Sequence, residues 1–551
     1  MRGEIGRASP DVLLIHPPAT RPAGPPLGTG VLLSRLRRLG IRAEAVDANL
    51  EAYLHLLVED RLQAAAGPGA STAVRRAVRH AARALAFLRS PGAAASFPRY
   101  AAAARHLNAA LSAHRGEGRS ERLTLGDYTH GGLSEFSPAD LSRVADGRDG
   151  TVFGGYFRGD LLPRVSGLRP RCVGISVNFR HQVLPAFELA GLLRRALPGV
   201  PVVGGGGMLT SWKRPLLAAG RRLPAFTRIV FGPGEGALAR IAAGGVSRDE
   251  YFLHGSGEAE FLPDFGFAEL RDYVSPEPVL PVAASRGCYW GRCGFCPEAV
   301  APTHPHRTHD PAAFPELLQE LSRRYSVTRF HLTDNAVPPQ TLRALVARAD
   351  ALRGISWHGF ARFERDLLAP GFASGLAAAG CAMLQLGLES GSQRLLDRMG
   401  KGTRVSDAAE TLAHLRAAGI ATYVYVMLGA PGETAGDAEA TLAFLERHAG
   451  NIDYLNLSIL NLPREAEGEK VPGGDGTYGV SAGRDDGALG LYRPVPATAG
   501  WGRPQARRFL SRRILGLPAV RGIVARTPPG FASNHAFFFR GGRAPTSAGD
   551  S

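Results

Sequence analysis

The segment SRGCYWGRCGFCPE, Ser285–Glu298, decides how the rest of the chain is interpreted. It holds Cys288, Cys293 and Cys296 in the spacing C-x4-C-x2-C, with an arginine beside the first two. Three thiolates this close cannot all pair as disulfides, and a neighbouring cation favours the thiolate form. Soft thiolates in a short loop bind zinc or an iron–sulfur cluster. Because such a cluster normally has four cysteine ligands, three would leave one iron open to a substrate or cofactor.

A zinc knuckle is the alternative interpretation of this loop. Zinc takes a fourth protein ligand, and His304, His306 and His309 follow closely enough to supply one. The remaining cysteines, Cys172 and Cys381, stand alone in apolar runs. The choice between zinc and iron therefore depends on the rest of the chain.

The cysteine loop resembles that of the radical S-adenosylmethionine (SAM) superfamily. The common motif of that superfamily is C-x3-C-x2-C with an aromatic residue before the last cysteine, a place that Phe295 fills. The x4 spacing is one residue longer, as in members that also carry an N-terminal cobalamin-type domain. The resemblance implies a [4Fe–4S] cluster on Cys288, Cys293 and Cys296, with SAM chelated by the open iron.

Composition limits the other classes of function. The 551 residues predict two or three domains, and 44% hydrophobic residues suffice for sizeable cores. The five cysteines indicate a reducing compartment, and we expect a cytoplasmic protein because we find neither a signal peptide nor a membrane-spanning apolar run. The net charge of +16 comes from arginines spread along the chain, which disfavours nucleic acid as the partner.

The N-terminal region predicts a Rossmann-like, doubly wound parallel sheet. A strand at 11–16, a Pro/Gly loop, a helix at 29–39 and a strand at 43–47 form a βαβ start. Further strands are expected at Cys172–Val177, Val202–Val203 and Arg228–Phe231. Between them, residues 50–165 predict a helical insertion, with helices near 74–90 and 99–114.

Three Gly/Pro loops follow these strands: PPLG, GGGG and GPGEGAL. Glycines at the carboxyl ends of parallel strands let a ligand approach closely. Together with IHPP and GISVN, these loops resemble the cobalamin-binding domain that precedes some radical SAM domains, although the D-x-H-x-x-G motif that supplies a cobalt-ligating histidine is absent. The resemblance implies a cobalamin site on Pro26, Leu27, Ser176, Asn178, Gly205, Gly206, Gly234 and Glu235.

The second half alternates strands and helices. Strands are expected at Pro281–Ser285, Thr328–Thr333, Ser356–Arg362, Ala382–Leu388, Thr422–Leu428 and Tyr454–Leu460, with helices near 311–325, 338–352, 366–379, 404–418 and 434–448. This alternation predicts a parallel barrel with its chemistry at the carboxyl ends of the strands. Six units match the partial (β/α)6 barrel of radical SAM enzymes. We therefore expect domains at 1–245 and 278–463, a linker at 246–277 and a C-terminal extension at 464–551, whose aromatic run GFASNHAFFFR covers the open end of the barrel.

Polar residues and glycines stand at the predicted strand ends, as a site in a barrel requires. Asp334, Ser390 and Thr434 could each be helix caps instead. The resemblance, which the strings LGLESGS, LLDRMGKG and MLGAPGET extend, implies SAM contacts. The implied SAM-binding residues are Phe295, Asp334, Asn335, Arg362, Glu389, Ser390 and Gly429; Arg362 suits the carboxylate as a planar donor fork.

The resemblance implies an enzyme that reductively cleaves SAM to a 5′-deoxyadenosyl radical. We expect cobalamin-dependent methyl transfer to an unactivated carbon in cofactor or natural-product biosynthesis, with a small-molecule or peptide substrate. The implied electron donor is a flavodoxin or ferredoxin. The alternatives are a radical SAM cyclase or rearrangement enzyme without cobalamin and a zinc-stabilised RNA-binding protein. Transfer of a methylthio group to tRNA is disfavoured because no additional N-terminal cysteine triplet is present.

Overall fold

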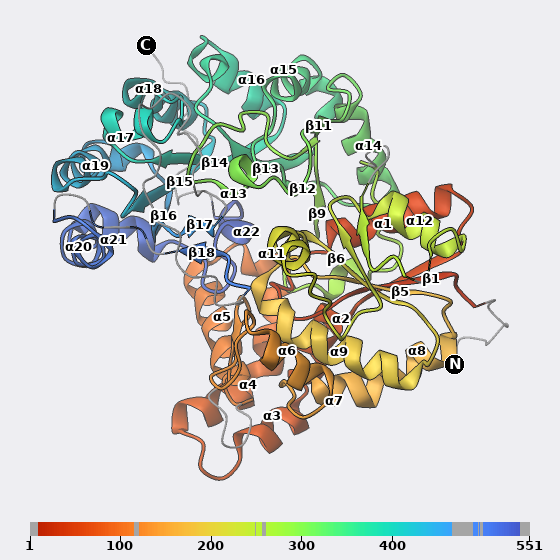
Figure 1. The fold of residues 1–551 in the computed structure, drawn as a ribbon. Helices are drawn as coiled ribbons and strands as arrows, with labels where there is room; N and C mark the ends of the chain where they lie inside the picture. The colour runs from red at the N-terminus through yellow and green to blue at the C-terminus, as the bar shows by residue number, and fades with distance from the viewer. Residues whose placement is uncertain are drawn as a thin grey trace. The chain divides into compact units, whose positions relative to one another are not determined.

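The structure is a computed structural model that describes residues 9–114, 121–247, 249–255, 261–464, 489–493, 495, 497 and 500–539. The chain divides into two compact units, of which the first runs to Pro278 and the second begins at Val279. Leu489 also belongs to the first unit. Figure 1 labels many of the helices and strands of both units.

The first unit is built on six parallel strands in the order β2-β1-β5-β6-β7-β8. The strands are β1 (Val12–His16), β2 (Ala43–Asp47), β5 (Val173–Ser176), β6 (Val202–Gly205), β7 (Arg228–Phe231) and β8 (Phe252–His254). The order reverses between β1 and β5, and such a reversal is where doubly wound sheets bind ligands. The predicted fold class is confirmed for this half of the chain.

Helices cover both faces of this sheet (Figure 1). Helix α1 (Leu27–Arg38) and helix α12 (Glu235–Ala242) bury leucines and alanines against one face. On the other face lies α9 (Val183–Ala196), of which every residue from Val183 to Leu193 is buried. Because both faces are covered, β1 is buried along its whole length, as its unbroken apolar run predicts.

The segment between β2 and β5 is helical, as expected. Its helices are α2 (Ala48–Leu56), α3 (Glu59–Ala66), α4 (Thr72–Leu88), α5 (Phe97–Leu111), α6 (Pro138–Ala145), α7 (Gly154–Tyr156) and α8 (Leu162–Leu168), with a short ribbon of β3 (Arg122–Leu123) and β4 (Tyr128–Thr129). Helices α4 and α5 pack side by side through their alanines and leucines. Short helices α10 (Gly207–Ser211) and α11 (Lys213–Ala218) follow β6.

Residues 246–277 are more than the linker that we expected. They contribute the edge strand β8, which pairs with β7. They also contribute Tyr273, whose hydroxyl donates a hydrogen bond of 2.6 Å to Asp47 at the end of β2. Their apolar and polar contacts therefore make most of this segment part of the first unit.

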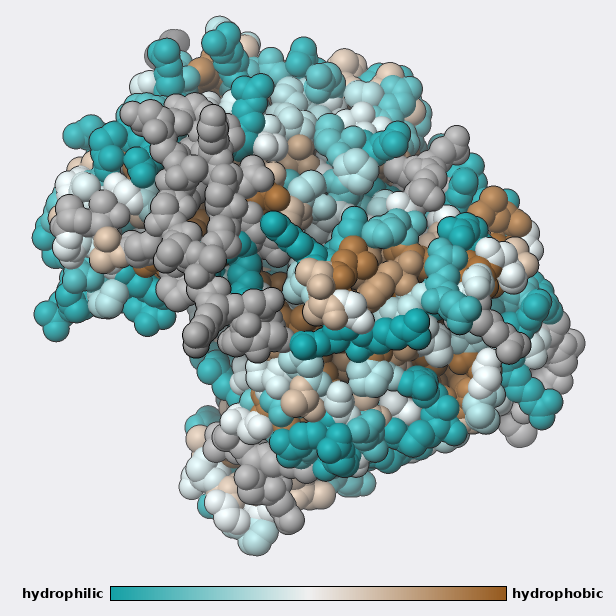
Figure 2. All heavy atoms as spheres, in the orientation of Figure 1, coloured by the Kyte–Doolittle hydropathy of each residue, from teal (hydrophilic) through white to brown (hydrophobic). Residues whose placement is uncertain are grey.

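The second unit is built on six parallel strands that neighbour one another in chain order. The strands are β9 (Val279–Val282), β12 (Arg329–Leu332), β13 (Ser356–Ala361), β14 (Cys381–Glu389), β15 (Ala421–Leu428) and β16 (Tyr454–Ile459). The connecting helices are α14 (Phe314–Tyr325), α15 (Pro339–Ala347), α16 (Phe372–Ala378), α17 (Gln393–Arg398), α18 (Val405–Ala417) and α19 (Ala435–His448). Figure 2 shows hydrophilic side chains over much of the outward surface of these helices. The six βα units confirm the predicted partial barrel.

The first predicted barrel strand is the one that differs most from its expected bounds. It ends at Val282, and Ser285 and Arg286 form instead a short antiparallel ribbon, β10 (Ser285–Arg286) with β11 (Arg307–Thr308). The ribbon closes the loop that contains the three cysteines and the short helix α13 (Pro297–Val300). It thereby fixes both ends of the cysteine loop at the carboxyl end of β9.

The C-terminal region packs on the barrel. Helices α20 (Arg503–Phe509), α21 (Pro518–Ala525) and α22 (Ser533–Ala536) follow the ribbon of β17 (Leu462–Pro463) and β18 (Tyr492–Arg493). Phe537 packs against the first residues of the strands, among them Val279 and Tyr423. The aromatic run therefore fills the amino end of the barrel interior, which leaves the carboxyl ends of the strands for a site.

Candidate functional site

The three cysteines of the loop after β9 lie close together. Cys293 is buried, and Cys288 and Cys296 are half-buried. Burial, together with the smaller effect of the charges of Cys293 and Cys288, raises the pKa of Cys296 to about 11. Sulfurs that repel one another in this way need a cation or a metal cluster between them to be deprotonated together.

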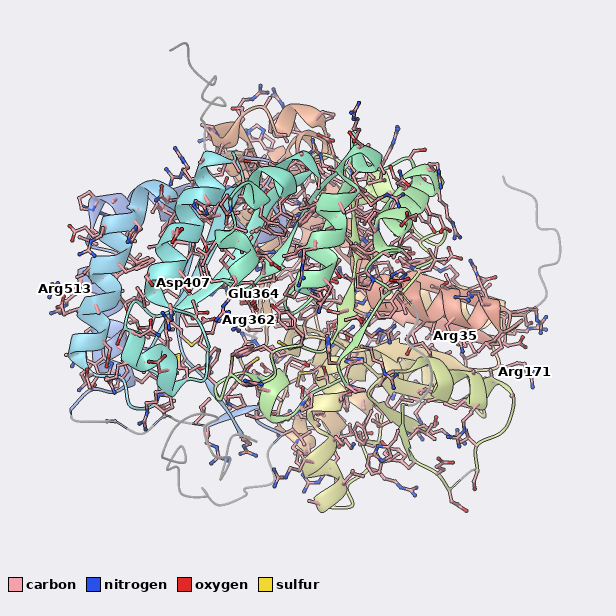
Figure 3. All side chains as sticks on the ribbon, turned by 90° about the horizontal axis from the view of Figure 1, so that it is seen from above. Arg35, Arg171, Arg362, Glu364, Asp407 and Arg513 are labelled. Carbon is pink, nitrogen blue, oxygen red and sulfur yellow. The ribbon has the colours of Figure 1, made fainter. Side chains whose placement is uncertain are left out.

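Two buried cations face Cys293. Burial raises the pKa of this thiol, while Lys401 and Arg362 lower it. Arg362 Nη1 lies 4.0 Å from Cys293 Sγ. The Arg362 side chain is fixed in this position because its Nε donates to Glu364 Oε1 at 3.1 Å and its Nη2 donates to the Lys401 carbonyl (Figure 3).

Trp290 completes the wall beside the cysteines. The Arg362 guanidinium lies over its ring at 4.1 Å, and its Nε1 donates a hydrogen bond of 2.9 Å to the carbonyl of Gly400. Gly402 has a φ of 67°, and a Cβ there would overlap the ring of Trp290. This glycine is therefore needed both for its backbone conformation and for the approach of the indole.

A buried ion pair stands at the end of β14. Lys401 Nζ lies 2.7 Å from Glu389 Oε1, and both side chains are less than a tenth exposed. Glu389 has a φ of 66° at a register shift between β14 and β15. A Cβ on Gly387 would overlap the ends of both side chains, so the ion pair lies directly against the backbone of the strand.

Three of the predicted SAM residues, Asp334, Ser390 and Gly429, make contacts that hold the loops in place, and their binding of SAM stays a prediction. Asp334 accepts from the backbone of Ala284 at 3.0 Å and from the Ser285 hydroxyl at 2.6 Å, and burial raises its pKa to about 6. It is therefore not the helix cap that we considered, since it anchors the base of the cysteine loop. Asn335, the next residue, is exposed.

The loops after β14 and β15 are joined in the same way. Ser390 shares a hydrogen bond of 3.0 Å with Thr441 of α19, and the residue that caps α17 is Ser392, not Ser390. Thr434 caps α19 as expected. The backbone N–H of Gly429 donates to Glu433.

Two features of this site were not predicted from the sequence. Lys401 lies in the string LLDRMGKG, yet nothing local indicates that it pairs with Glu389, twelve residues earlier. Glu433 accepts from Gly429 and from the indole of Trp501 at 2.9 Å, and burial raises its pKa to about 7. For Glu433 the sequence offered a signal, since it stands in the glycine-containing string MLGAPGET after a predicted strand, whereas Lys401 had none.

The residues expected to bind cobalamin lie at the carboxyl edge of the first unit's sheet. Asn178 donates to Ser176 at 3.0 Å and accepts from Gly207 N at 3.0 Å, which ties the loop after β5 to the loop after β6. Gly206 has a φ of 103°, and a Cβ there would overlap the carbonyl of Val177.

The other expected cobalamin residues flank the starts of two helices. Helix α1 begins at Leu27, directly after Pro26. Helix α12 begins at Glu235, directly after Gly234. Gly234 packs against α1, because a Cβ on it would lie 3.3 Å from Leu32. The structure thus gathers the eight residues along one edge, and whether they bind a ligand stays a prediction.

The histidines of the zinc alternative make local hydrogen bonds. The Nδ1 atoms of His304, His306 and His309 lie within 3.2 Å of the Thr303 hydroxyl, the Arg286 carbonyl and the Asp310 carbonyl, respectively. Within the ranges that the structure describes, no three His, Cys, Asp or Glu side chains are gathered as ligands of one metal ion.

The fold and the cysteine loop together define a partial parallel barrel with a thiolate site at the carboxyl ends of its strands. Residues 282–445 match the model of the Radical SAM superfamily. This part of the chain is therefore a radical SAM domain, and such a domain implies a [4Fe–4S] cluster and SAM as cofactors. The cysteines, the cations beside them and the open strand ends fit that pair.

Two curated relatives resemble part of the chain. An uncharacterized methyltransferase of Pyrococcus horikoshii is 26% identical over 203 residues, which are 36% of this chain and 43% of the relative. A tRNA-2-methylthio-N(6)-dimethylallyladenosine synthase of an Anaeromyxobacter species is 28% identical over 273 residues, which are 46% of this chain and 55% of the relative. The chain thus spans about half the length of the curated relatives it matches.

Two solved structures share the fold over most of the chain. The radical SAM methyltransferase TsrM from Kitasatospora setae, bound to tryptophan and a SAM analogue, superposes with a TM-score of 0.50 at 18% identity, over 82% of this chain and 73% of TsrM. The cobalamin-dependent SAM radical enzyme OxsB, bound to aqua-cobalamin and SAM, gives a TM-score of 0.51 at 16% identity, over 80% of this chain and 52% of OxsB. These likenesses confirm the predicted combination of folds. In the part of the chain that the structure describes, no helix is both long and apolar enough to cross a bilayer.

Proposed function

We propose that this protein is a radical SAM enzyme that transfers a methyl group from cobalamin to an unactivated carbon of a small-molecule or peptide substrate. The observation that carries the proposal is the loop after β9. It holds three cysteines, of which Cys293 lies beside Arg362 and Lys401, within a domain that matches the superfamily model. The cluster would supply one electron to cleave the sulfonium bond of SAM, and the residues around it would bind and orient SAM.

The charged residues at the strand ends suit the amino-acid end of SAM, which carries an ammonium and a carboxylate. Glu389 is an anion for the ammonium, and Arg362 is a planar donor for the carboxylate. Lys401 already neutralises Glu389 at 2.7 Å and would share it with the ligand. A zwitterion bound here would pair its ammonium with Glu389 and its carboxylate with Arg362, so that neither buried side chain would be left without a partner.

The floor of the barrel suits a reactive intermediate. Phe360 and Tyr425 pack with ring centroids 5.2 Å apart, and the hydroxyl of Tyr425 donates to Gln385 at 2.7 Å. Below them the interior is closed by His358 and Phe537, stacked at 4.2 Å. A barrel that is closed at its amino end keeps bulk water away from radical chemistry at the other end.

Cobalamin is assigned to the carboxyl edge of the first unit's sheet. The edge is lined with glycines, of which Gly206 leaves no space for a side chain, and it lies beside the reversal of strand order where such sheets bind cofactors. OxsB, which has this fold, binds cobalamin, and the Pyrococcus relative is named a methyltransferase. The relative that modifies tRNA does not change the proposal, because the match covers 55% of that relative, and Cys172 and Cys381, the remaining cysteines of this sequence, stand alone.

Anaerobic reconstitution tests the proposal. The protein is loaded with iron and sulfide and incubated with SAM, dithionite and methylcobalamin, with Cys293→Ala as the control. We expect 5′-deoxyadenosine together with S-adenosylhomocysteine from the wild type and neither from the variant. Deoxyadenosine alone would assign the enzyme to cyclisation or rearrangement chemistry without cobalamin, and the absence of both products with an intact cluster would contradict the proposal.

A further inference from the structure

Four exposed arginines surround the cysteine loop of the second unit. They are Arg292, Arg307, Arg365 and Arg404, which we call the basic rim. Among the residues that the structure describes, none of the four has an acidic partner within ion-pair distance. Four unpaired guanidiniums around one loop are an electrostatic signal for an anionic partner.

Printed contacts bring the four segments that carry the rim together. Tyr289, in the cysteine loop, donates a hydrogen bond of 2.7 Å to Glu364, the neighbour of Arg365. Its ring lies 6.4 Å from that of His306, the neighbour of Arg307. On the other side of the loop, Trp290 contacts Gly400 and Gly402, two residues before Arg404.

Local stability does not explain the charge of the rim. Arg286 and Arg307 stand directly opposite each other in the β10–β11 ribbon, and like charges in that position destabilise a strand pair. Glu364, which precedes Arg365 in the chain, lies beside the buried Arg362 (Figure 3) and already accepts hydrogen bonds from Tyr289 and from Arg362. It is therefore not available to neutralise the rim.

The rim is connected to the cluster site through stacked side chains. The guanidinium of Arg292 lies over the ring of Trp290 at 5.1 Å, and that of Arg362 lies over the same ring at 4.1 Å. Arg362 then reaches to 4.0 Å from Cys293 Sγ. A partner seated on the rim would thus be separated from the cluster cysteines by little more than one indole and one guanidinium.

We infer that the basic rim is the docking site of an acidic electron-donor protein of the flavodoxin or ferredoxin class. The inference rests on the proposed function, because a radical SAM reaction consumes one electron for each SAM that is cleaved. The donor loses that electron and the cluster on the three cysteines gains it, and no bond forms or breaks at the interface. A nucleic acid would also match the charge, but it would not explain why the rim surrounds the cluster loop.

The test compares two pairs of charge reversals. The variant Arg365→Glu/Arg404→Glu changes the rim, and Arg323→Glu/Arg521→Glu makes the same change at exposed arginines on α14 and α21. Binding of a reduced flavodoxin to the reconstituted enzyme is measured by calorimetry at low and high salt. We expect the rim variant to bind at least about tenfold more weakly at low salt, because each reversal places like charges across the interface, and we expect the control to bind like the wild type.

Reductant dependence separates docking from catalysis. With dithionite, which needs no docking site, the rim variant should cleave SAM as fast as the wild type. With flavodoxin it should be slower by about the factor lost in binding.

Equal binding by the rim variant and the wild type, or an equal loss in the control, would overturn the inference. Loss of binding to a short RNA with flavodoxin binding unchanged would assign the rim to nucleic acid. Absence of cleavage with dithionite in the wild type would contradict the proposed function instead, and the binding measurement would still decide the docking site.

Discussion

Removing the charge of Lys401 tests the buried ion pair at the end of β14. Its Nζ lies 2.7 Å from Glu389 Oε1, with the two side chains 8% and 9% exposed. Two unit charges at that separation attract by about 6 kcal/mol at an effective dielectric constant of about 20. Desolvation offsets part of this, but leaving one partner buried and alone costs about 3 to 5 kcal/mol. We expect Lys401→Met to lower the free energy of unfolding of the apoprotein by that amount.

Urea unfolding followed by tryptophan fluorescence measures this loss. Three of the four tryptophans, Trp290, Trp357 and Trp501, lie in the second unit, so the signal reports mainly on the barrel. The control is the double variant Lys401→Met/Glu389→Gln, which removes both charges. It should recover to within about 1 kcal/mol of the wild type, because a neutral pair has no uncompensated charge.

The double variant also separates stability from ligand binding. If Glu389 and Lys401 serve the amino-acid end of SAM, the folded double variant should bind SAM at least about tenfold more weakly, a loss of about 1.4 kcal/mol. Equilibrium dialysis with the reconstituted protein measures this affinity. Wild-type affinity in a stable double variant would show that the pair is structural only, and it would refute the assignment of Glu389 to SAM.

Three further predictions concern the cluster loop and the barrel interior. Cys293→Ala should abolish bound iron and acid-labile sulfide, measured chemically after reconstitution, whereas Cys172→Ala in the other unit should retain both; iron retained by the first variant would contradict the ligand assignment. Gly402→Ala, which forces a methyl group against Trp290 at a left-handed φ, should destabilise the barrel by about 1 to 3 kcal/mol, and an unchanged urea midpoint would be inconsistent with the packing described. Burial lowers the pKa of His331 to about 4, so the unfolded chain takes up a proton that the folded chain does not as the pH falls below about 6.5. The contribution of His331 to the free energy of unfolding should therefore fall by about 2 kcal/mol between about pH 7 and pH 5. In His331→Phe, the free energy of unfolding measured with urea should fall by that much less over the same pH range.

The order of strands and helices could be predicted because each has a local cause. Apolar runs such as Val12–His16 are buried on both faces, and a short, buried, continuous run bounded by turn residues favours a parallel strand. In the barrel, the helix that begins after Thr434 follows from its capping residue and an acidic first turn. The boundary of β9 could not be predicted, because Ser285 and Arg286 leave the strand to pair with a segment twenty residues away.

The cysteines could be predicted from their spacing alone, but their neighbours could not. Arg362 follows a predicted strand and was identified, whereas Lys401 lies in a loop with no local signal. Its role depends on the contact with Glu389, which the chain makes only after α17 folds back. Asp334 shows the converse: its place at a strand end was correctly identified, but its partners Ala284 and Ser285 lie 50 and 49 residues earlier, respectively.

The backbone at Glu389 indicates that the position of its carboxylate matters more than local stability. A non-glycine residue at a φ of 66° costs on the order of 1 to 3 kcal/mol, and a glycine would avoid that cost. The register shift between β14 and β15 falls at this residue, and a bulge of that kind re-aims a side chain. The strained backbone places the redirected carboxylate beside Lys401, and the charge of Lys401 also lowers the pKa of Cys293. An ion pair serving only to stabilise the barrel would gain nothing from a strained backbone, since an exposed and relaxed position would hold it at lower cost. The strained backbone therefore supports the proposal that Glu389 presents its negative charge to a ligand beside the cluster.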